Sequence, residues 1–289
     1  MDIESPKAID TVPISKITTI SGDLSQNKTT DTLNKKSTIS CDSPSLHVVQ
    51  PKDIQLIETD DPEDLIKKGN FNEAIAKLQK IIEDKVQQMG ENNLEVAILY
   101  RRLGSAFMKN KEYPDAIGSF KTSLRIFILL YNEDHDECVL NYSLLGEAYH
   151  KKGELESAET FYTRALSTLE RNKKEDNLVK AKIFERLGSL YKYRGQYGEA
   201  MQKYDQALEI KNNLLGENHI DIAENYDSIG LLFCAQGKFR EAIGSIRQGL
   251  QIREAHLGES DPGLATSFNR LSYVYVNQGK YEDAKNYAQ

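Results

Sequence analysis

The sequence predicts an all-α fold, a right-handed α-solenoid (superhelix) of stacked antiparallel helix pairs, because one pattern recurs every 42 residues. Three features share this period. A small residue marks each unit, an apolar stripe surrounds it, and an alanine follows twelve residues later. The small residues are Gly104, Gly146, Gly188, Gly230 and Ser272, and the alanines are Ala116, Ala158, Ala200, Ala242 and Ala284.

The apolar stripe predicts the first helix of each unit. Phe184, Leu187, Gly188 and Tyr191 show the pattern, with spacing i, i+3, i+4 and i+7. Residues at this spacing share one face of an α-helix. We expect helix backbones to approach closely at the glycine and alanine columns, because no bulky side chain separates them there.

A second helix is predicted to begin three residues before each alanine. Those starting residues are Tyr113, Leu155, Tyr197, Phe239 and Tyr281. Glycine readily adopts the positive φ that ends a helix and permits a tight turn. Glycines lie between the two helices of four units, at Gly153, Gly195, Gly237 and Gly279. Each unit is therefore predicted to be a helical hairpin.

The repeat changes at both ends. Upstream, Gly69 falls in register, but Pro62 replaces the marker glycine, so we expect Asp61 and Pro62 to cap a shortened first helix. Downstream, the chain stops at Gln289, five residues past Ala284, whereas earlier second helices continue further. We therefore expect a truncated last unit and a chain that is a fragment of a longer protein.

The N-terminal segment has a different composition. Residues 1–52 contain no Phe, Tyr or Trp and are rich in Ser and Thr. Such a segment buries too little apolar surface to offset its conformational entropy. The sequence thus predicts a disordered Ser/Thr-rich tail over residues 1–52. It predicts a solenoid of about six units over residues 53–289, the first degenerate and the last truncated.

Composition and motifs narrow the function classes. A formal net charge of −7 disfavours nucleic-acid binding, which needs clustered Lys and Arg. The longest apolar run, Ile126 to Tyr131, is far shorter than the roughly 20 residues that span a bilayer. The chain has no phosphate-binding glycine loop, dinucleotide pattern or metalloprotease histidine pair. We therefore expect a cytoplasmic protein without catalytic activity or cofactor, with its three cysteines as free thiols.

The positions that recur every 42 residues resemble the tetratricopeptide signature, in which an aromatic residue, Leu-Gly, a second aromatic residue and Ala recur at these spacings. The links between units, such as Leu215-Gly216-Glu217 and Leu257-Gly258-Glu259, are similar to those of kinesin light chains and related scaffolds, whose repeats are also 42 residues long. The resemblance implies a superhelix that binds proteins in a concave groove. The paired asparagines of kinesin light chains are matched only at Asn269, and residues 1–52 show no heptad coiled coil.

Two histidines invite a metal interpretation, but helix capping explains them better. His135 and His219 occupy the same column of the links, near Asp136 and Asp221 respectively. Side chains of this kind satisfy free backbone amides at a helix start. In other units the column holds typical N-cap residues, namely Asn93, Asn177 and Asp261. We predict five N-caps and no metal site.

The first helices of tetratricopeptide proteins line the concave surface. Positions six, three and two before the marker residue, and one and four after it, should then face inward. Apolar members of this set include Leu140 and Leu144. The polar members and one tyrosine are the candidate partner-binding residues: Arg101, Arg102, Ser105, Ser143, Glu147, His150, Lys182, Glu185, Arg186, Ser189, Lys192, Glu224, Asp227, Asn269, Arg270 and Tyr273.

The charges of these candidates suggest what the groove binds. Basic residues dominate its N-terminal and middle parts, whereas Glu224 and Asp227 are acidic. We hypothesise that an extended or short helical peptide with an acidic segment binds there through charge-assisted hydrogen bonds. Self-association through the truncated last unit is a further option.

The predicted function is a protein-interaction module or scaffold, with a kinesin-light-chain-like cargo adaptor as one form. An alternative is a regulatory arm of a larger multidomain enzyme or signalling protein whose catalytic part lies outside this chain.

Overall fold

The structure is a computed structural model that describes residues 61–172, 177–258 and 261–288. The predicted tail over residues 1–52, the first residues of the predicted solenoid and Gln289 lie outside the described residues. The described residues form twelve α-helices and one short 3-10 helix, η2. Their bounds are α1 Pro62–Lys68, α2 Phe71–Met89, α3 Leu94–Lys109, α4 Tyr113–Tyr131, α5 Asp136–Lys152, α6 Leu155–Arg171, α7 Leu178–Tyr193, α8 Tyr197–Leu215, η2 Ile220–Ile222, α9 Ala223–Ala235, α10 Phe239–His256, α11 Pro262–Asn277 and α12 Tyr281–Ala288.

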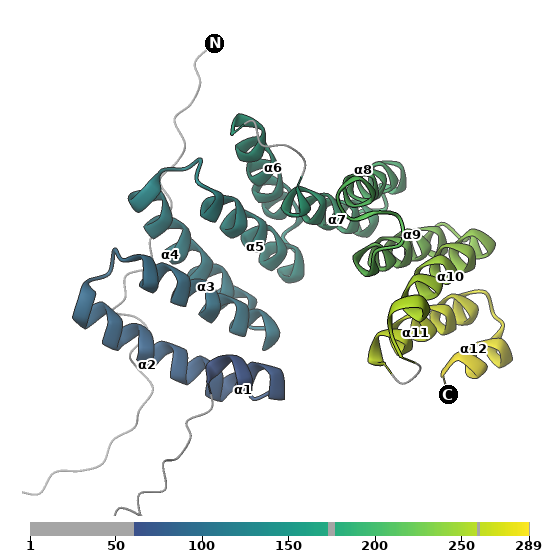
Figure 1. The fold of residues 1–289 in the computed structure, drawn as a ribbon, viewed down its shortest axis with the longest axis horizontal. Coiled ribbons are helices and arrows are strands. Elements are labelled where there is room, and N and C mark those ends of the chain that lie inside the picture. The colour runs from purple at the N-terminus through teal and green to yellow at the C-terminus, as the bar shows by residue number, and fades with distance from the viewer. Residues whose placement is uncertain (1–60, 173–176, 259–260, 289) are drawn as a thin grey trace, which may run out of the picture. The chain divides into compact units, whose positions relative to one another are not determined.

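Consecutive helices pack as pairs, and the pairs stack along the chain, as Figure 1 shows. Each odd-numbered helix is the first helix of a unit, and each even-numbered helix is the second. From α4 onward, all five second helices begin at the residue that the 42-residue pattern predicts. The predicted solenoid of helical hairpins is confirmed.

The shortened first helix is also confirmed. The Asp61 side chain accepts a hydrogen bond from the backbone N–H of Glu63 at 3.3 Å, and Pro62 is the first helical residue. A turn with positive φ follows α5 at Gly153, where φ is 92°. Lys111 lies at the equivalent turn of an earlier unit and adopts a φ of 64°. Glycine would adopt this positive φ with less strain.

All five predicted link caps are present. His135 accepts a hydrogen bond from the backbone N–H of Glu137 at 3.3 Å, and His219 accepts one from Asp221 at 3.2 Å. The remaining three links use the side-chain oxygens of Asn93, Asn177 and Asp261 in the same way. The two histidines therefore have a structural role at helix starts.

Three of the four marker glycines pack against aromatic side chains of the second helix rather than against its backbone. A Cβ atom at Gly188 would lie 2.7 Å from the ring of Tyr204 in the second helix of the same unit. Gly104 and Gly146 face Phe120 and Tyr162 equally closely, at 2.6 Å. These rings are almost fully buried. At these three glycines the expected reason is corrected, because the missing side chain leaves room for a large ring. At Gly230 the expected close approach of backbones holds, since a Cβ atom there would lie 3.0 Å from the backbone oxygen of Ala242 as well as 2.5 Å from the side chain of Ile246.

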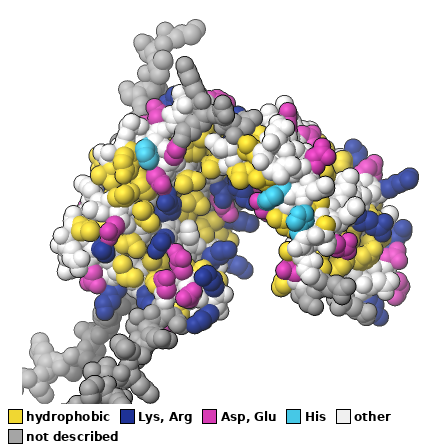
Figure 2. Space-filling model, viewed as in Figure 1, with side chains coloured by type: hydrophobic (Ala, Val, Ile, Leu, Met, Phe, Trp, Pro, Cys, Tyr) yellow, Lys and Arg dark blue, Asp and Glu magenta, His cyan; other side chains and the backbone are white. Residues whose placement is uncertain are grey.

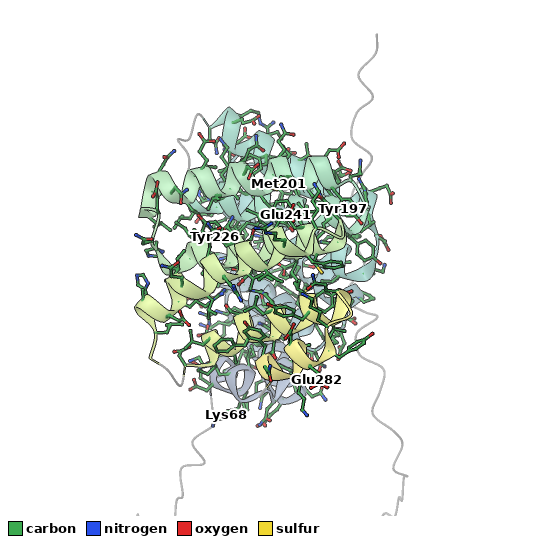
Figure 3. All side chains as sticks on the ribbon, turned by 90° about the vertical axis from the view of Figure 1, so that its right-hand side faces the viewer. Lys68, Tyr197, Met201, Tyr226, Glu241 and Glu282 are labelled. Atoms are coloured by element: carbon green, nitrogen blue, oxygen red, sulfur yellow. The ribbon has the colours of Figure 1, made fainter. Side chains whose placement is uncertain are left out.

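The apolar core follows the stack. One cluster of buried side chains runs from α2 to α8, and smaller clusters surround α9, α10 and α11. Tyr197 and Met201 of α8, labelled in Figure 3, pack against the cluster that contains Ile229 and Leu232 of α9. Among the described residues, no helix combines the length and apolar character that crossing a membrane requires.

Candidate functional site

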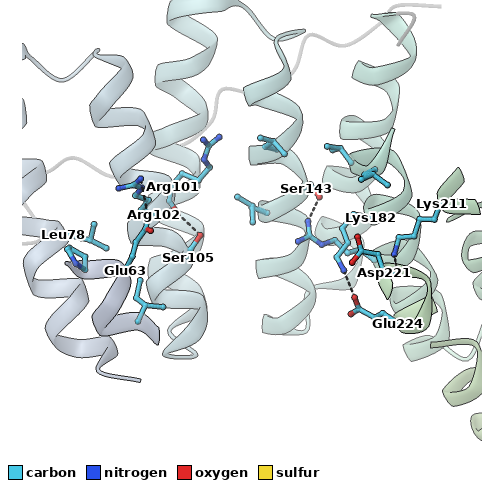
Figure 4. Close-up of a pocket in the computed structure, with 17 residues that line it drawn as sticks. Glu63, Leu78, Arg101, Arg102, Ser105, Ser143, Lys182, Lys211, Asp221 and Glu224 are labelled. Atoms are coloured by element: carbon cyan, nitrogen blue, oxygen red, sulfur yellow. Dashed lines mark hydrogen bonds and ion pairs between the residues drawn. The ribbon is translucent and has the colours of Figure 1, made fainter. Parts of the chain in front are cut away.

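A groove of about 820 Å³ runs along the first helices of successive units. Its lining comes mainly from α1, α3, α5, α7 and the start of α9. Figure 2 shows this part of the molecule hollowed, with Lys and Arg side chains along the hollow, and Figure 4 shows the lining in detail. Seven candidate residues line it: Arg101, Arg102, Ser105, Ser143, Lys182, Arg186 and Glu224.

Apolar side chains contribute much of the lining. Leu140 and Leu144 come from α5, and Leu178 and Val179 from the first turn of α7. Leu140 and Leu178 are 36% and 43% exposed. Large apolar side chains that stay exposed within one concave surface are typical of a binding site.

Two arginines connect the first helices of consecutive units in the same way. Arg102 pairs with Glu63 at 3.3 Å. Arg186 pairs with Glu147 and also donates to the hydroxyl of Ser143. In both ion pairs the acid lies 39 residues before the arginine, so the pairs are structurally equivalent. The Arg102–Glu63 pair is exposed, and such pairs contribute little stability, whereas Arg186 and Glu147 are half-buried.

The other three cations of the groove, Arg101, Lys182 and Lys211, also have acidic partners. Arg101 pairs with Glu137. Lys182 pairs with Glu185 at 3.1 Å and with Glu224 at 3.3 Å. Burial acts to lower the pKa of Lys182, but the two glutamates outweigh it and raise the pKa. An acidic peptide would therefore have to replace carboxylates of the chain itself.

Glu185 and Asp227 do not face an open groove, and that expectation is corrected. They are 8% and 0% exposed and pair with Lys211 and Arg253 of the second helices. Lys211 also donates to the side-chain oxygen of Asn225 at 2.7 Å. The two acids lie 42 residues apart and hold neighbouring helices together. A buried carboxylate without a cationic partner would lower the stability of the fold, so each of the two acids is paired.

A second hollow of about 580 Å³ lies among α7, α9 and α11. Four further candidate residues line it: Lys192, Asn269, Arg270 and Tyr273. Arg270 also pairs with the buried carboxylate of Asp227. Burial raises the pKa of Asp227, although Arg253 and Arg270 act in the opposite direction.

Three candidates lie outside both hollows without being buried. Glu147 belongs to the Arg186 pair. His150 is half-buried, with the Tyr193 ring edge-on at 6.1 Å, and burial lowers its pKa, an effect that nearby Lys151 increases. Ser189 forms a hydrogen bond with the hydroxyl of Tyr204.

The sequence register missed the apolar groove residues on α7. Leu178 and Val179 lie ten and nine residues before the marker Gly188, one turn beyond the positions that the register included. Extending the inward face by one turn toward the helix start would have found them.

Metal ligation has no support in the described part of the chain. Residues 61–172, 177–258 and 261–288 contain no group of three His, Cys, Asp or Glu side chains placed to hold a metal ion. The two described cysteines, Cys138 and Cys234, are buried free thiols. Burial raises the pKa of Cys138 to about 11, which leaves it protonated at neutral pH.

Comparison with known families decides the classification. One tetratricopeptide repeat family matches residues 95–171 and 180–255, and a second tetratricopeptide repeat family matches residues 264–289. The chain belongs to the tetratricopeptide repeat family. The fold class predicted from the 42-residue period is thereby confirmed by an independent comparison.

Solved structures show the same fold. BtubC (BKLC) from P. vanneervenii has a TM-score of 0.62 and 24% identity, over 75% of this chain and 87% of that one. A kinesin light chain assigned in Podospora anserina, with nearly identical tetratricopeptide-like repeats, has a TM-score of 0.53 and 18% identity, over 65% of this chain and 89% of that one. A Rap protein in complex with Competence and Sporulation Factor has a TM-score of 0.58 and 20% identity, over 75% of this chain and 60% of that one. No curated protein matches the sequence.

Proposed function

We propose that this tetratricopeptide chain is a non-catalytic interaction scaffold that holds a peptide segment of a partner protein in the first-helix groove. The exposed apolar lining of that groove carries the proposal. Leu140, Leu144, Leu178 and Val179 lie in one concave surface that is long enough to involve five successive first helices. Burying these side chains against a partner would supply the main driving force for binding.

The ion pairs of the groove provide selectivity. Arg102 has an exposed acidic partner and Arg186 a half-buried one, and a bound peptide can replace either. Exchange of one carboxylate for another changes affinity less than a new ion pair does, because the cation is paired before and after. We therefore expect apolar side chains of the peptide to set affinity, and an acidic segment to set its position and the salt dependence.

A cargo adaptor of the kinesin-light-chain kind is the form of this function that we favour. The 42-residue unit and the fold shared with BtubC and the Podospora protein support it. The Rap protein, solved with a bound factor, supports the capacity of such a fold to hold another molecule. We place this role in the cytoplasm, where the buried thiols of Cys138 and Cys234 would stay reduced.

Peptide selection on the full chain tests the proposal. Peptides selected from a displayed library are measured by calorimetry against the wild-type chain and a double variant, Leu140→Glu with Leu178→Glu. Each leucine contributes about 1.5 kcal/mol or more if it becomes buried on binding, so the affinity should fall more than tenfold.

The matched control makes the same change at two exposed leucines outside the groove. Leu129 and Leu214 are 61% and 48% exposed and line neither hollow. Leu129→Glu with Leu214→Glu should leave affinity unchanged, and circular dichroism should show both variants folded. Equal affinities for the two double variants would contradict the proposal.

A further inference from the structure

The second hollow differs from the main groove in charge. Glu63, Asp221 and Glu224 line the main groove together with its cations. Within the described residues, no Asp or Glu lines the second hollow. Its polar lining consists of side chains that donate hydrogen bonds: Lys192, Thr266, Asn269, Arg270, Tyr273 and Asn277. Such a lining is suited to an anion.

Lys192 is the cation of this hollow that lacks a counter-charge. It is half-buried, and the described part of the chain offers it no ion pair or hydrogen bond. Burial lowers the pKa of Lys192, and the positive charge of Arg270 lowers it further. A partly desolvated ammonium group without a partner is unfavourable, so an anion that enters the hollow would relieve that cost.

The charges behind the hollow strengthen this imbalance. Arg253 and Arg270 both pair with the same carboxylate oxygen of Asp227. Together with Lys192, the site has three cations and one carboxylate, a formal excess of two positive charges. Glu224, the acid at the adjoining end of the main groove, is already paired with Lys182.

We propose that this hollow binds the phosphate group of a phosphorylated serine or threonine in the peptide that the main groove holds. The inference rests on the proposed function. A phosphomonoester has about −1.5 to −2 charges at neutral pH and three acceptor oxygens, which match the excess of two charges and the several donors. A carboxylate has one charge and two oxygens and would leave half of the excess uncompensated.

The two hollows share helices, so one peptide can reach both. Arg186 of α7 lines the main groove, and Lys192, six residues later on the same helix, lines the second hollow. Six residues of an α-helix span about 9 Å, a distance that three or four residues of extended peptide cover.

Three versions of a selected peptide test the proposal on the full chain. They have serine, phosphoserine or glutamate at the position that faces α7 and α11, and calorimetry measures their affinities. We expect phosphoserine to bind about tenfold or more tighter than serine, with glutamate in between. Lys192→Gln should bring the ratio of phosphoserine to serine affinity down to near one.

Lys182→Gln is the matched control. Lys182 is also a lysine of α7, but it already has two glutamate partners. This variant should retain the gain from phosphorylation. The proposal is overturned if Lys192→Gln retains the full gain, or if glutamate binds as tightly as phosphoserine. Thermal melting should show Lys192→Gln at least as stable as wild type, because the change removes a poorly solvated charge.

A readout without any peptide separates this inference from the proposed function. Free O-phosphoserine and serine are titrated into the chain while NMR follows the side-chain amides of Asn269 and Asn277. Phosphoserine alone should shift both signals, and Lys192→Gln should abolish the shifts. If no peptide binds yet the shifts appear, the proposed function fails and the phosphate site stands. If phosphoserine causes no shift, the phosphate site is refuted.

Discussion

Replacement of a marker glycine tests the packing that produces the solenoid. A Cβ atom at Gly188 would lie 2.7 Å from the ring of Tyr204, a side chain that is only 1% exposed and has little space to move. Overpacking of this kind costs about 1–3 kcal/mol. Alanine also favours a helix interior over glycine by about 1 kcal/mol, which offsets part of the cost.

A second glycine isolates the packing cost. Gly118 lies inside α4, is exposed, and has no heavy atom within 4 Å of the place where a Cβ would be. Gly118→Ala therefore gains the helix preference without the clash. The difference between the two variants should equal the overpacking cost, about 1–3 kcal/mol, or roughly 2–12 °C in melting temperature for a domain of this size.

Urea unfolding and thermal melting of both variants measure this difference. Gly188→Ala should be less stable than Gly118→Ala in each assay. Equal stabilities would refute the account of the glycine column, since both variants make the same chemical change in a helix and only their surroundings differ.

Three further changes have defined outcomes. Lys211→Met leaves the buried carboxylate of Glu185 without its closest cation and should lower the free energy of unfolding by about 3–5 kcal/mol, whereas Glu185→Leu with Lys211→Met should recover much of that loss. His135→Ala removes an N-cap and should cost about 0.5–2 kcal/mol, with zinc leaving the wild-type melting temperature unchanged; a zinc-dependent rise would support a metal site instead. Burial lowers the pKa of His150 in the folded chain, so its contribution to stability is present above the ordinary value of 6.5 and is lost as pH falls. Urea unfolding at pH 7.5 and 5.5 should therefore show a smaller pH effect in His150→Gln than in wild type, and identical pH effects would contradict this.

The fold could be predicted from the sequence because the units repeat the same steric requirements. A glycine that faces a large side chain of the second helix, an alanine between close helices and a cap at each link recur in successive units, so each unit supports the interpretation of the others. The starts of five second helices and all five link caps follow from this register.

The candidate site was less predictable, because a column in the register gives the direction of a side chain but not what covers it. Glu185 and Asp227 occupy an inward column, yet Lys211 and Arg253 of the second helices reach them. The sequence does contain a signal for these ion pairs. A basic residue lies 26 residues after each acid, at a position where earlier units have an apolar residue. Pairing acids in one column with bases in another would have identified both as buried ion pairs.

Photo-crosslinking tests the central claim, that the first-helix groove holds a partner peptide, most directly. A photoreactive amino acid is placed at Leu178 in the groove or at Leu214 outside it, two positions of similar exposure. Mass spectrometry then locates the covalent bond to a selected peptide. We expect a crosslink from position 178 and none from position 214. A crosslink from position 214 alone would contradict it.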